Sequence, residues 1–165
     1  MNPLATSQRG IRILAFFLTA GLVVIVDQAT KAAIRVVSPS LGHIGTLIPG
    51  VIDLVHVENT GAAFSIGVGA GFLFVIAALV VACLAFVFVR TQDVPLALTI
   101  ALACVVGGGL GNMFDRIMTG SVTDFLATTF VSFPVFNVAD IAVTCGVVIS
   151  AILYVIWQNS LPSED

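Results

Sequence analysis

Long apolar runs without a single charged residue divide this sequence, and they constrain its fold more than any other feature. The runs are Ile13–Val26, Gly67–Val89, Val94–Phe114 and Ile141–Trp157. A helix of about 20 apolar residues is long enough to cross the roughly 30 Å hydrocarbon core of a bilayer. Only 9% of the residues are charged and 59% are hydrophobic, whereas soluble domains carry about 25% charged residues. The sequence therefore predicts an integral membrane protein.

The runs predict an all-α membrane domain of four transmembrane helices over residues 1–165, spanning about 12–31, 67–89, 94–114 and 138–157. The first run is short, because 14 residues reach only about 21 Å. Arg12 can snorkel at one end, and the helix can continue through Asp27–Lys31 at the other. A cleaved signal peptide is the alternative. No site of the small-x-small type follows the run, which favours a retained helix.

Two long segments, about 32–66 and 115–137, lie on one side of the membrane in a four-helix topology and hold most of the polar residues. The basic residues divide equally between the two sides, so their distribution does not orient the chain. Val51–Glu58 is rich in β-branched residues and follows a Pro49–Gly50 turn, with Ile44–Ile48 as a possible partner strand. We expect a small extramembrane sheet in the first long segment.

Several polar residues lie where hydrocarbon would make them costly, at about 2.5–3.5 kcal/mol for each ionisable group at a helix centre. Asp27 and Lys31 are four residues apart, so they share a helical face and can pair; the pair can be purely structural. Asn59–Ser65 is a turn of small residues, in which Asn59 can cap the following helix. Gly107 and Gly111 form a close-packing helix face.

Asp124 and Asp140 each lie among apolar residues, in Val122–Leu126 and Phe136–Asp140. Two carboxylates brought together cannot both ionise comfortably, so such a pair shares a proton. A pair of this kind can activate water against a peptide carbonyl. The alternative is that the two aspartates are separate helix N-caps.

The sequence also argues against several other functions. It has no G-x-S-x-G or H-E-x-x-H motif, and no strand precedes its glycine run, so serine hydrolases, zincins and P-loop proteins are excluded. No basic patch could bind nucleic acid. Cys83, Cys104 and Cys145 lack the spacing of a zinc site or a disulfide framework and are expected to be buried packing residues. We expect no metal and no cofactor.

Two non-peptidase functions remain possible from the residues alone. A small channel or transporter subunit would need polar residues at mid-helix depth, for which Thr99 and Thr144 are the candidates. A non-enzymatic assembly factor would need no paired carboxylates.

Five motifs, taken in order and spacing, resemble lipoprotein signal peptidases, the bacterial signal peptidase II family. They are D-x-x-T-K at Asp27–Lys31, N-x-G-A-A-F at Asn59–Phe64, G-G-x-x-G-N-x-x-D-R from Gly108 to Arg116 with Gly107 before it, V-x-D-F at Val122–Phe125, and F-N-x-A-D at Phe136–Asp140. Departures are small: Gly109 stands where Ala is more usual, and Leu126 where Ile is common.

The resemblance implies an aspartic endopeptidase with Asp124 and Asp140 as its catalytic dyad. The enzyme would remove the signal peptide of a diacylglyceryl-modified prolipoprotein on the amino side of the lipidated lipobox cysteine. The residues it places around the substrate are Asn59, Gly108, Asn112, Arg116 and Asn137. Asp27, Lys31 and Asp115 would support the site, and we interpret Asp115 as a structural partner of Arg116.

The resemblance also orients the chain, which the basic residues did not. Both termini would be cytoplasmic, and the active site and the sheet would lie on the extracytoplasmic face of a bacterial cell membrane. The expected partners are diacylglyceryl-prolipoprotein substrates and membrane lipid, and we expect a monomer.

Overall fold

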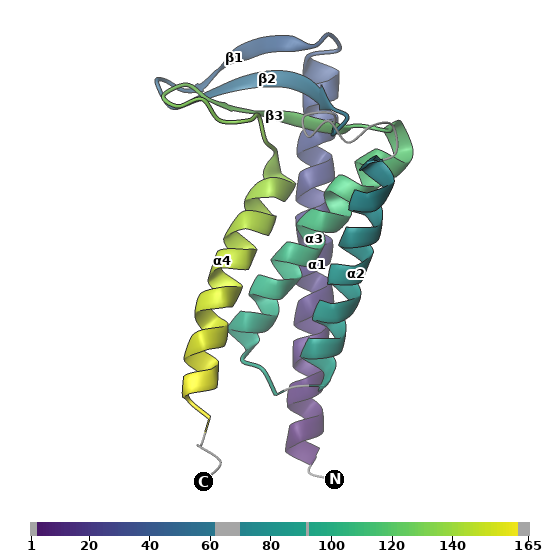
Figure 1. The fold of residues 1–165 in the computed structure, drawn as a ribbon, viewed down its shortest axis with the longest axis vertical. Coiled ribbons are helices and arrows are strands. Elements are labelled where there is room, and N and C mark those ends of the chain that lie inside the picture. Colours follow the sequence, from purple (N-terminus) through teal and green to yellow (C-terminus); the bar gives the residue numbers. More distant parts are fainter. Residues whose placement is uncertain (1–2, 62–69, 92, 162–165) are drawn as a thin grey trace.

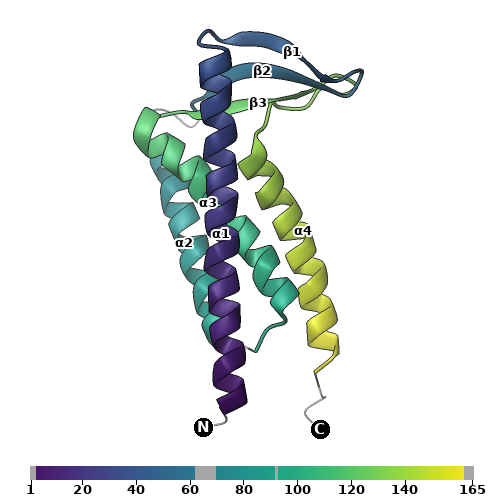
Figure 2. The same ribbon diagram turned by 180° about the vertical axis from the view of Figure 1, so that it is seen from behind.

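The computed structural model describes residues 3–61, 70–91 and 93–161. The helices are α1 (Pro3–Val37), α2 (Ala70–Thr91), α3 (Leu96–Thr119) and α4 (Val138–Asn159), and the strands are β1 (Gly42–Ile48), β2 (Ile52–Asn59) and β3 (Val122–Thr128). The helices form an elongated bundle with the sheet across one end, while α1 begins and α4 ends at the other (Figures 1 and 2). Both chain termini thus lie far from the sheet.

Three helical stretches in the described part of the chain are long and apolar enough to cross a membrane. They are Gln8–Val37, Leu96–Thr119 and Val138–Asn159. In α2, Ile76–Thr91 is a shorter apolar stretch, and residues 67–69 of the span predicted at 67–89 lie outside the described residues. The prediction of a helical membrane protein is confirmed.

Two helices extend further than the apolar runs predicted. α1 has 35 residues, or about 52 Å, and continues to Val37 because Lys31 and Arg35 find buried partners instead of ending the helix. α3 continues to Thr119 and ends at Gly120, whose left-handed φ of 79° suits glycine. The segments predicted as extramembrane from 32 and from 115 therefore both begin as helix.

The predicted pairing of Ile44–Ile48 with Val51–Glu58 is confirmed as the antiparallel pair β1 and β2. The sequence predicts a sheet within the first long segment alone, and this is wrong. The third strand, β3, comes from the second long segment. β3 pairs antiparallel with β2, which gives the order β1-β2-β3. The sheet thereby joins the two segments that carry most of the polar motifs.

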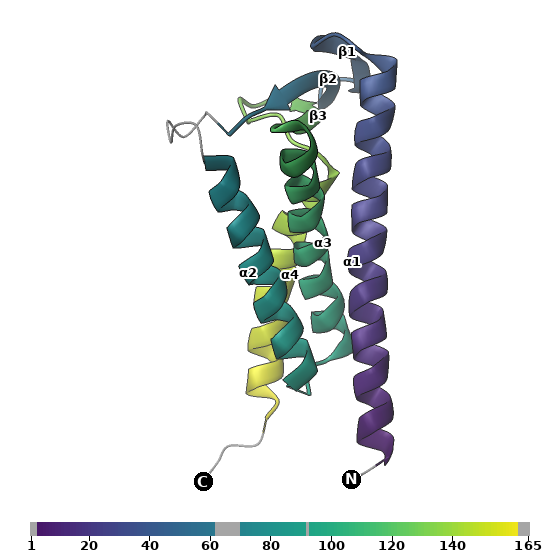
Figure 3. The same ribbon diagram turned by 90° about the vertical axis from the view of Figure 1, so that its right-hand side faces the viewer.

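α3 packs against each of the other helices, and Figure 3 shows it between α1 and α2 with α4 behind. The core includes Phe16, Val89, Leu98 and Ala103. The outer helix faces carry exposed leucine, isoleucine and valine side chains, as expected for surfaces in contact with lipid. The prediction of buried cysteines is wrong for Cys83 and Cys145, which are exposed on these outer faces.

Candidate active site

The residues that the sequence analysis singled out gather where the helices meet the sheet, from α1, α3, α4, β2 and β3. One set of hydrogen bonds and close contacts connects them. They are Asp27, Lys31, Asn59, Gly108, Asn112, Asp115, Arg116, Asp124, Asn137 and Asp140.

Asp124 lies in β3 and is 2% exposed. Its Oδ1 accepts a hydrogen bond from Asn137 Nδ2 at 2.7 Å, and its Oδ2 accepts one from Asn59 Nδ2 at 2.9 Å. Burial raises the pKa of Asp124 to about 6; the negative charge of Asp140 acts in the same direction, while the two amide hydrogen bonds oppose the shift. Because Asp124 is a strand residue, the alternative that it caps a helix is wrong.

Asp140 lies in the first turn of α4. Asn137 is the N-cap of that helix, and the two residues form a capping box: Asp140 N–H donates to Asn137 Oδ1, and Asn137 N–H donates to Asp140 Oδ2, both at 3.0 Å. Asn112 Nδ2 donates to the other oxygen, Oδ1, at 2.8 Å. The helix start therefore fixes the orientation of this carboxylate.

Two amides join the carboxylates. Asn137 Nδ2 donates to Asp124 and also contacts Asn112 Oδ1 at 3.0 Å, while the Asn112 amide nitrogen donates to Asp140. Asp124 and Asp140 are 16 positions apart in the sequence, yet hydrogen bonds through Asn137 and Asn112 connect them. Asp124 is buried and Asp140 is half-buried, and the two carboxylates lie within electrostatic range of each other, so the protonation of one affects the other.

Lys31 is fully buried beneath these amides. Its Nζ contacts Asp27 Oδ2 at 2.8 Å, Asp115 Oδ2 at 2.9 Å and Asn112 Oδ1 at 2.8 Å. These contacts use all three of its N–H donors. The predicted pairing of Asp27 with Lys31 is thus present in the structure, and the lysine also fixes the Asn112 amide so that its nitrogen faces Asp140.

Asp115 makes hydrogen bonds and ion pairs with α1 that the sequence did not predict, while its structural partnership with Arg116 stays a prediction. Its carboxylate contacts Lys31 at 2.9 Å, Arg35 at 3.1 Å and Gln28 at 3.1 Å. Arg116 is half-buried, donates from Nη1 to the Asn112 carbonyl at 3.2 Å and lies within electrostatic range of Asp124, Asp140 and Asp115. Asp115 is therefore held in an ion-pair network.

The glycines of α3 allow the other helices to approach closely on two sides. A Cβ on Gly107 would lie 2.7 Å from the carbonyl oxygen of Ala20, and one on Gly111 would lie 2.5 Å from Asp27 Oδ2. The predicted packing face of these two glycines is confirmed, and it faces α1. A Cβ on Gly108 would collide with the Ala139 carbonyl oxygen, so Gly108 lets α4 begin beside α3.

Four polar residues of the network were missed from the sequence: Gln28, Arg35, Glu58 and Thr123. Arg35 could have been found, because Asp27, Lys31 and Arg35 follow one another at intervals of four on one helix face. Its guanidinium contacts Asp115 and donates from Nε to Thr123 Oγ1 at 2.9 Å. The contacts of Glu58 and Thr123 depend on the pairing of β2 with β3, for which no local pattern exists.

The Asn59 side chain does not serve as the cap of a following helix among the described residues. Its Oδ1 accepts the Gly61 N–H at 2.9 Å, and its amide nitrogen donates to Asp124. Ala62, Ala63 and Phe64 of the same motif lie outside the described residues.

Within the described residues, no group of three His, Cys, Asp or Glu side chains could hold a metal ion. The mid-helix candidates for a channel do not share a path. Thr99 is buried and donates to the Pro95 carbonyl of its own helix, and Thr144 is exposed on α4. The pair of Asp124, which is buried, and Asp140, which is half-buried, is the feature that could carry out acid–base chemistry.

The sequence of this chain is similar to those of known proteins over most of its length. The sequence profile of the family described as Signal peptidase (SPase) II matches residues 19–156. A lipoprotein signal peptidase of Enterococcus faecalis is 35% identical over 153 residues, which cover 92% of this chain and 94% of that protein. A lipoprotein signal peptidase of Parasynechococcus marenigrum is 42% identical over 148 residues, covering 88% and 90%.

Solved structures agree with the sequence comparison. A bacterial membrane enzyme, determined by the in meso method at 2.3 Å resolution, superimposes with a TM-score of 0.76 at 31% identity, covering 91% of this chain and 92% of that one. A second bacterial membrane enzyme, at 1.9 Å resolution, gives a TM-score of 0.76 at 32% identity and covers 84% and 91%.

Proposed function

This chain belongs to the signal peptidase II family, the peptidases of lipoprotein processing in bacterial membranes, and we propose that it is an aspartic endopeptidase. The observation that carries the proposal is the pair of the buried Asp124 and the half-buried Asp140, joined through Asn137 and Asn112. Asp115, another acidic residue of the network, is held by Lys31 and Arg35. It is therefore less suited to proton transfer than the pair.

The proposed mechanism divides the work between two protonation states. One aspartate is ionised and accepts a proton from a bound water, which attacks the scissile carbonyl. The other is protonated, polarises that carbonyl and then protonates the leaving amine. The raised pKa of Asp124, about 6, supports a pair that retains one proton at mildly acidic pH. Asn59, Asn112 and Asn137 orient the carboxylates, and no step needs a metal.

We propose that the substrate is a prolipoprotein whose lipobox cysteine already carries a diacylglyceryl group, and that cleavage falls on the amino side of that cysteine. The apolar outer surfaces of the helices support this class, because acyl chains could lie along them. The scissile bond would then lie at the depth of the aspartates, where helices meet sheet. Gly108 and Arg116 are the further residues that we place beside the substrate.

The proposed topology has four membrane-spanning helices, with α2 as the second, both termini in the cytoplasm and the active site on the extracytoplasmic face. The sheet, whose strand β3 carries Asp124, lies at the end opposite both termini, which supports this topology (Figure 1). A lipid-anchored substrate can reach such a site by diffusion within the membrane.

A cleavage assay tests the proposal. Purified wild type, Asp124→Asn and Asp140→Asn are incubated with a diacylglyceryl-modified prolipoprotein, and the size shift of the product is followed on a gel. We expect cleavage by the wild type alone, because each variant removes one of the two acid–base groups. Mass spectrometry of the product gives the position of the cut.

Asp53→Asn is the matched control, since Asp53 is a β2 carboxylate that pairs on the β1 side with Thr46. Its rate should equal that of the wild type. Appreciable turnover by Asp124→Asn would refute the catalytic dyad. Asp115 would then be the next candidate for the catalytic carboxylate. A folded wild type that leaves the lipid-modified substrate intact would favour the assembly-factor alternative.

A further inference from the structure

The paired strands β2 and β3 carry polar side chains on both faces. The bond between Asn59 and Asp124 lies on one face. Glu58 and Thr123, each one residue earlier in its strand, are direct cross-strand partners. Because side chains alternate along a strand, this pair lies on the opposite face. Glu58 thus holds Thr123, the residue immediately before the candidate catalytic Asp124. Glu58 itself has no role in the proposed mechanism.

The Glu58 carboxylate accepts from two hydroxyl donors and lies beside a histidine. Thr123 Oγ1 donates to Oε1 at 2.8 Å, the Ser121 hydroxyl donates to Oε2, and His56 Nε2 lies 3.2 Å from Oε1. Burial acts to raise the pKa of Glu58, but the hydrogen bonds from Ser121, Thr123 and His56 outweigh it and lower the pKa. Glu58 is therefore an acceptor-only carboxylate that holds Thr123 of β3 and Ser121, the residue just before β3, at once.

The donors around Glu58 are themselves anchored to α1 and the residues after it. Thr123 is fully buried, and its hydroxyl oxygen accepts from Arg35 Nε at 2.9 Å. The other ring nitrogen of His56, Nδ1, faces the Ser38 carbonyl oxygen at 2.6 Å. Glu58 therefore connects the β2–β3 pair to the end of the longest helix of the molecule.

The register between β2 and β3 near Asp124 depends on few backbone pairs, so a side-chain contact such as that of Glu58 with Thr123 can help to fix it. The ladder between β2 and β3 is irregular between Leu54 and Val57, and only three described pairs follow it: Val57 with Asp124, Glu58 with Thr123, and Asn59 with Val122. A slip of one residue would carry every side chain of β3 to the other face. Asp124 would then lose both Asn59 and Asn137.

We propose that Glu58 is a positioning residue, which fixes β3 in the register at which Asp124 meets Asn59 and Asn137. This inference rests on the proposed function, in which Asp124 is catalytic. Glu58 itself need not touch the substrate. It acts through Thr123, the residue before Asp124, and through Ser121, two residues earlier.

The test compares Glu58→Ala with Asp53→Ala in the purified full-length protein. Asp53 is a carboxylate of the same strand that also accepts from a hydroxyl and lies near a histidine, at 2.8 Å from Thr46 and 3.4 Å from His43, on the side away from Asp124. We expect Glu58→Ala to lower kcat by about tenfold to 100-fold with KM within about twofold, since small displacements of a catalytic group cost this much. Asp53→Ala should change neither constant.

The pH profile separates positioning from a general loss of stability. When Asp124 loses its amide donors, its pKa rises further, so the ionisation of Asp124 in the profile of kcat/KM moves to higher pH in Glu58→Ala and stays in place in Asp53→Ala. Glu58→Gln keeps one acceptor oxygen and should recover part of kcat. Thr123→Val removes the hydroxyl that donates to Glu58 and accepts from Arg35, and it should reproduce part of the loss if Glu58→Ala fails to fold.

Amide hydrogen exchange gives a readout that needs no substrate. In Glu58→Ala the amides of residues 122–124 should exchange faster than in the wild type, and in Asp53→Ala they should not. Unchanged exchange with unchanged kcat in Glu58→Ala would overturn the positioning role, as would an equal loss in Asp53→Ala. Failure of the wild type to cleave would count against the proposed function, while the exchange result would still decide the role of Glu58.

Discussion

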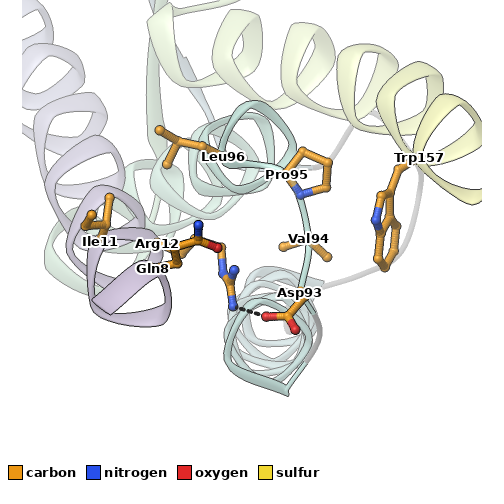
Figure 4. A pocket seen from close by; sticks show the side chains of 8 residues that line it. All are labelled: Gln8, Ile11, Arg12, Asp93, Val94, Pro95, Leu96 and Trp157. Atoms are coloured by element: carbon orange, nitrogen blue, oxygen red, sulfur yellow. Dashed lines mark hydrogen bonds and ion pairs between the residues drawn. The ribbon is translucent and has the colours of Figure 1, made fainter. Parts of the chain in front are cut away.

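The charged side chains at the two ends of the helix bundle differ in how deeply they are buried. At the sheet end, Lys31 and Asp27 are fully buried, and Lys31 contacts two carboxylates and an amide oxygen. At the other end, Arg12 pairs with Asp93 at 2.7 Å, but the Asp93 side chain is 89% exposed. Figure 4 shows this pair in a pocket bordered by Trp157.

The difference shows which charges the fold depends on. A buried ion that loses its partner costs several kcal/mol, whereas an exposed pair is stabilised little because water screens it. The sheet end is therefore the part where charge, packing and chemistry depend on one another, and the Arg12–Asp93 pair attaches α1 to the loop before α3. Four changes test this contrast.

The largest effect is expected from Lys31→Met. The variant leaves Asp27 and Asp115 buried without Lys31, which should cost about 3–5 kcal/mol of unfolding free energy. Thermal unfolding in detergent measures it, together with cleavage activity, which should be lost because Asn112 is no longer held. An unfolding temperature equal to that of the wild type would show that the buried network is not needed for stability.

Gly108→Ala should have the next largest effect. The added methyl group would collide with the Ala139 carbonyl oxygen at the start of α4, and overpacking of this kind costs about 1–3 kcal/mol. Because Asp140 lies in that turn, cleavage should slow as well. The control is Gly109→Ala, whose methyl group would lie 3.7 Å from Ala78 Cβ. It should leave both stability and activity intact, and equal losses in the two variants would contradict the packing argument.

Asp124→Asn should stabilise the fold at neutral pH by a smaller amount. The pKa of Asp124 is raised from 3.8 to about 6, so the folded state binds its proton more tightly than the unfolded state does. This contribution is complete below about pH 4 and is lost as the pH rises to about 6. The shift corresponds to at most about 3 kcal/mol, and the misplaced amide donor of Asn offsets about 1 kcal/mol of it.

Unfolding measurements across pH 4–8 check the sign of that effect. The stability advantage of Asp124→Asn over the wild type should grow as the pH rises to about 6 and then stay constant at about 1–2 kcal/mol. An advantage that grows toward acidic pH would mean that the pKa of Asp124 is lowered instead.

The smallest effect is expected from Asp93→Asn. The exposed side chain keeps one oxygen that can accept from Arg12, and exposed ion pairs contribute no more than about 1 kcal/mol. Unfolding temperature and cleavage rate should match those of the wild type. A loss as large as that of Lys31→Met would remove the contrast between the two ends.

Features that depend on near neighbours in the chain could be predicted well from the sequence. The apolar runs predicted the helices, and the spacing of four predicted the Asp27–Lys31 pair. The turn at Pro49–Gly50 predicted the pairing of β1 with β2. Each of these depends on residues a few positions apart, where helix and strand periodicity leaves a readable pattern.

The sequence did not predict contacts whose partners lie far along the chain. Arg12 is almost fully buried and pairs with Asp93, 81 positions away, and no local pattern indicates this partner. β3 was not predicted at all, because its partner β2 lies in the other long segment. The ion pairs of Asp115 with Lys31 and Arg35 of α1 were not predicted either.

The sequence by itself determined that this chain is a helical membrane protein, and its ordered motifs indicated the family. Only the tertiary structure decided how the motifs meet. Asp124 is oriented by Asn59 and Asn137, and Asp140 by Asn112, through contacts between segments that have no local relation. Local pattern encodes which face of an element is apolar, but the fold alone brings together polar groups from separate elements, and burial then fixes their hydrogen bonds because an unpaired group in this region is costly.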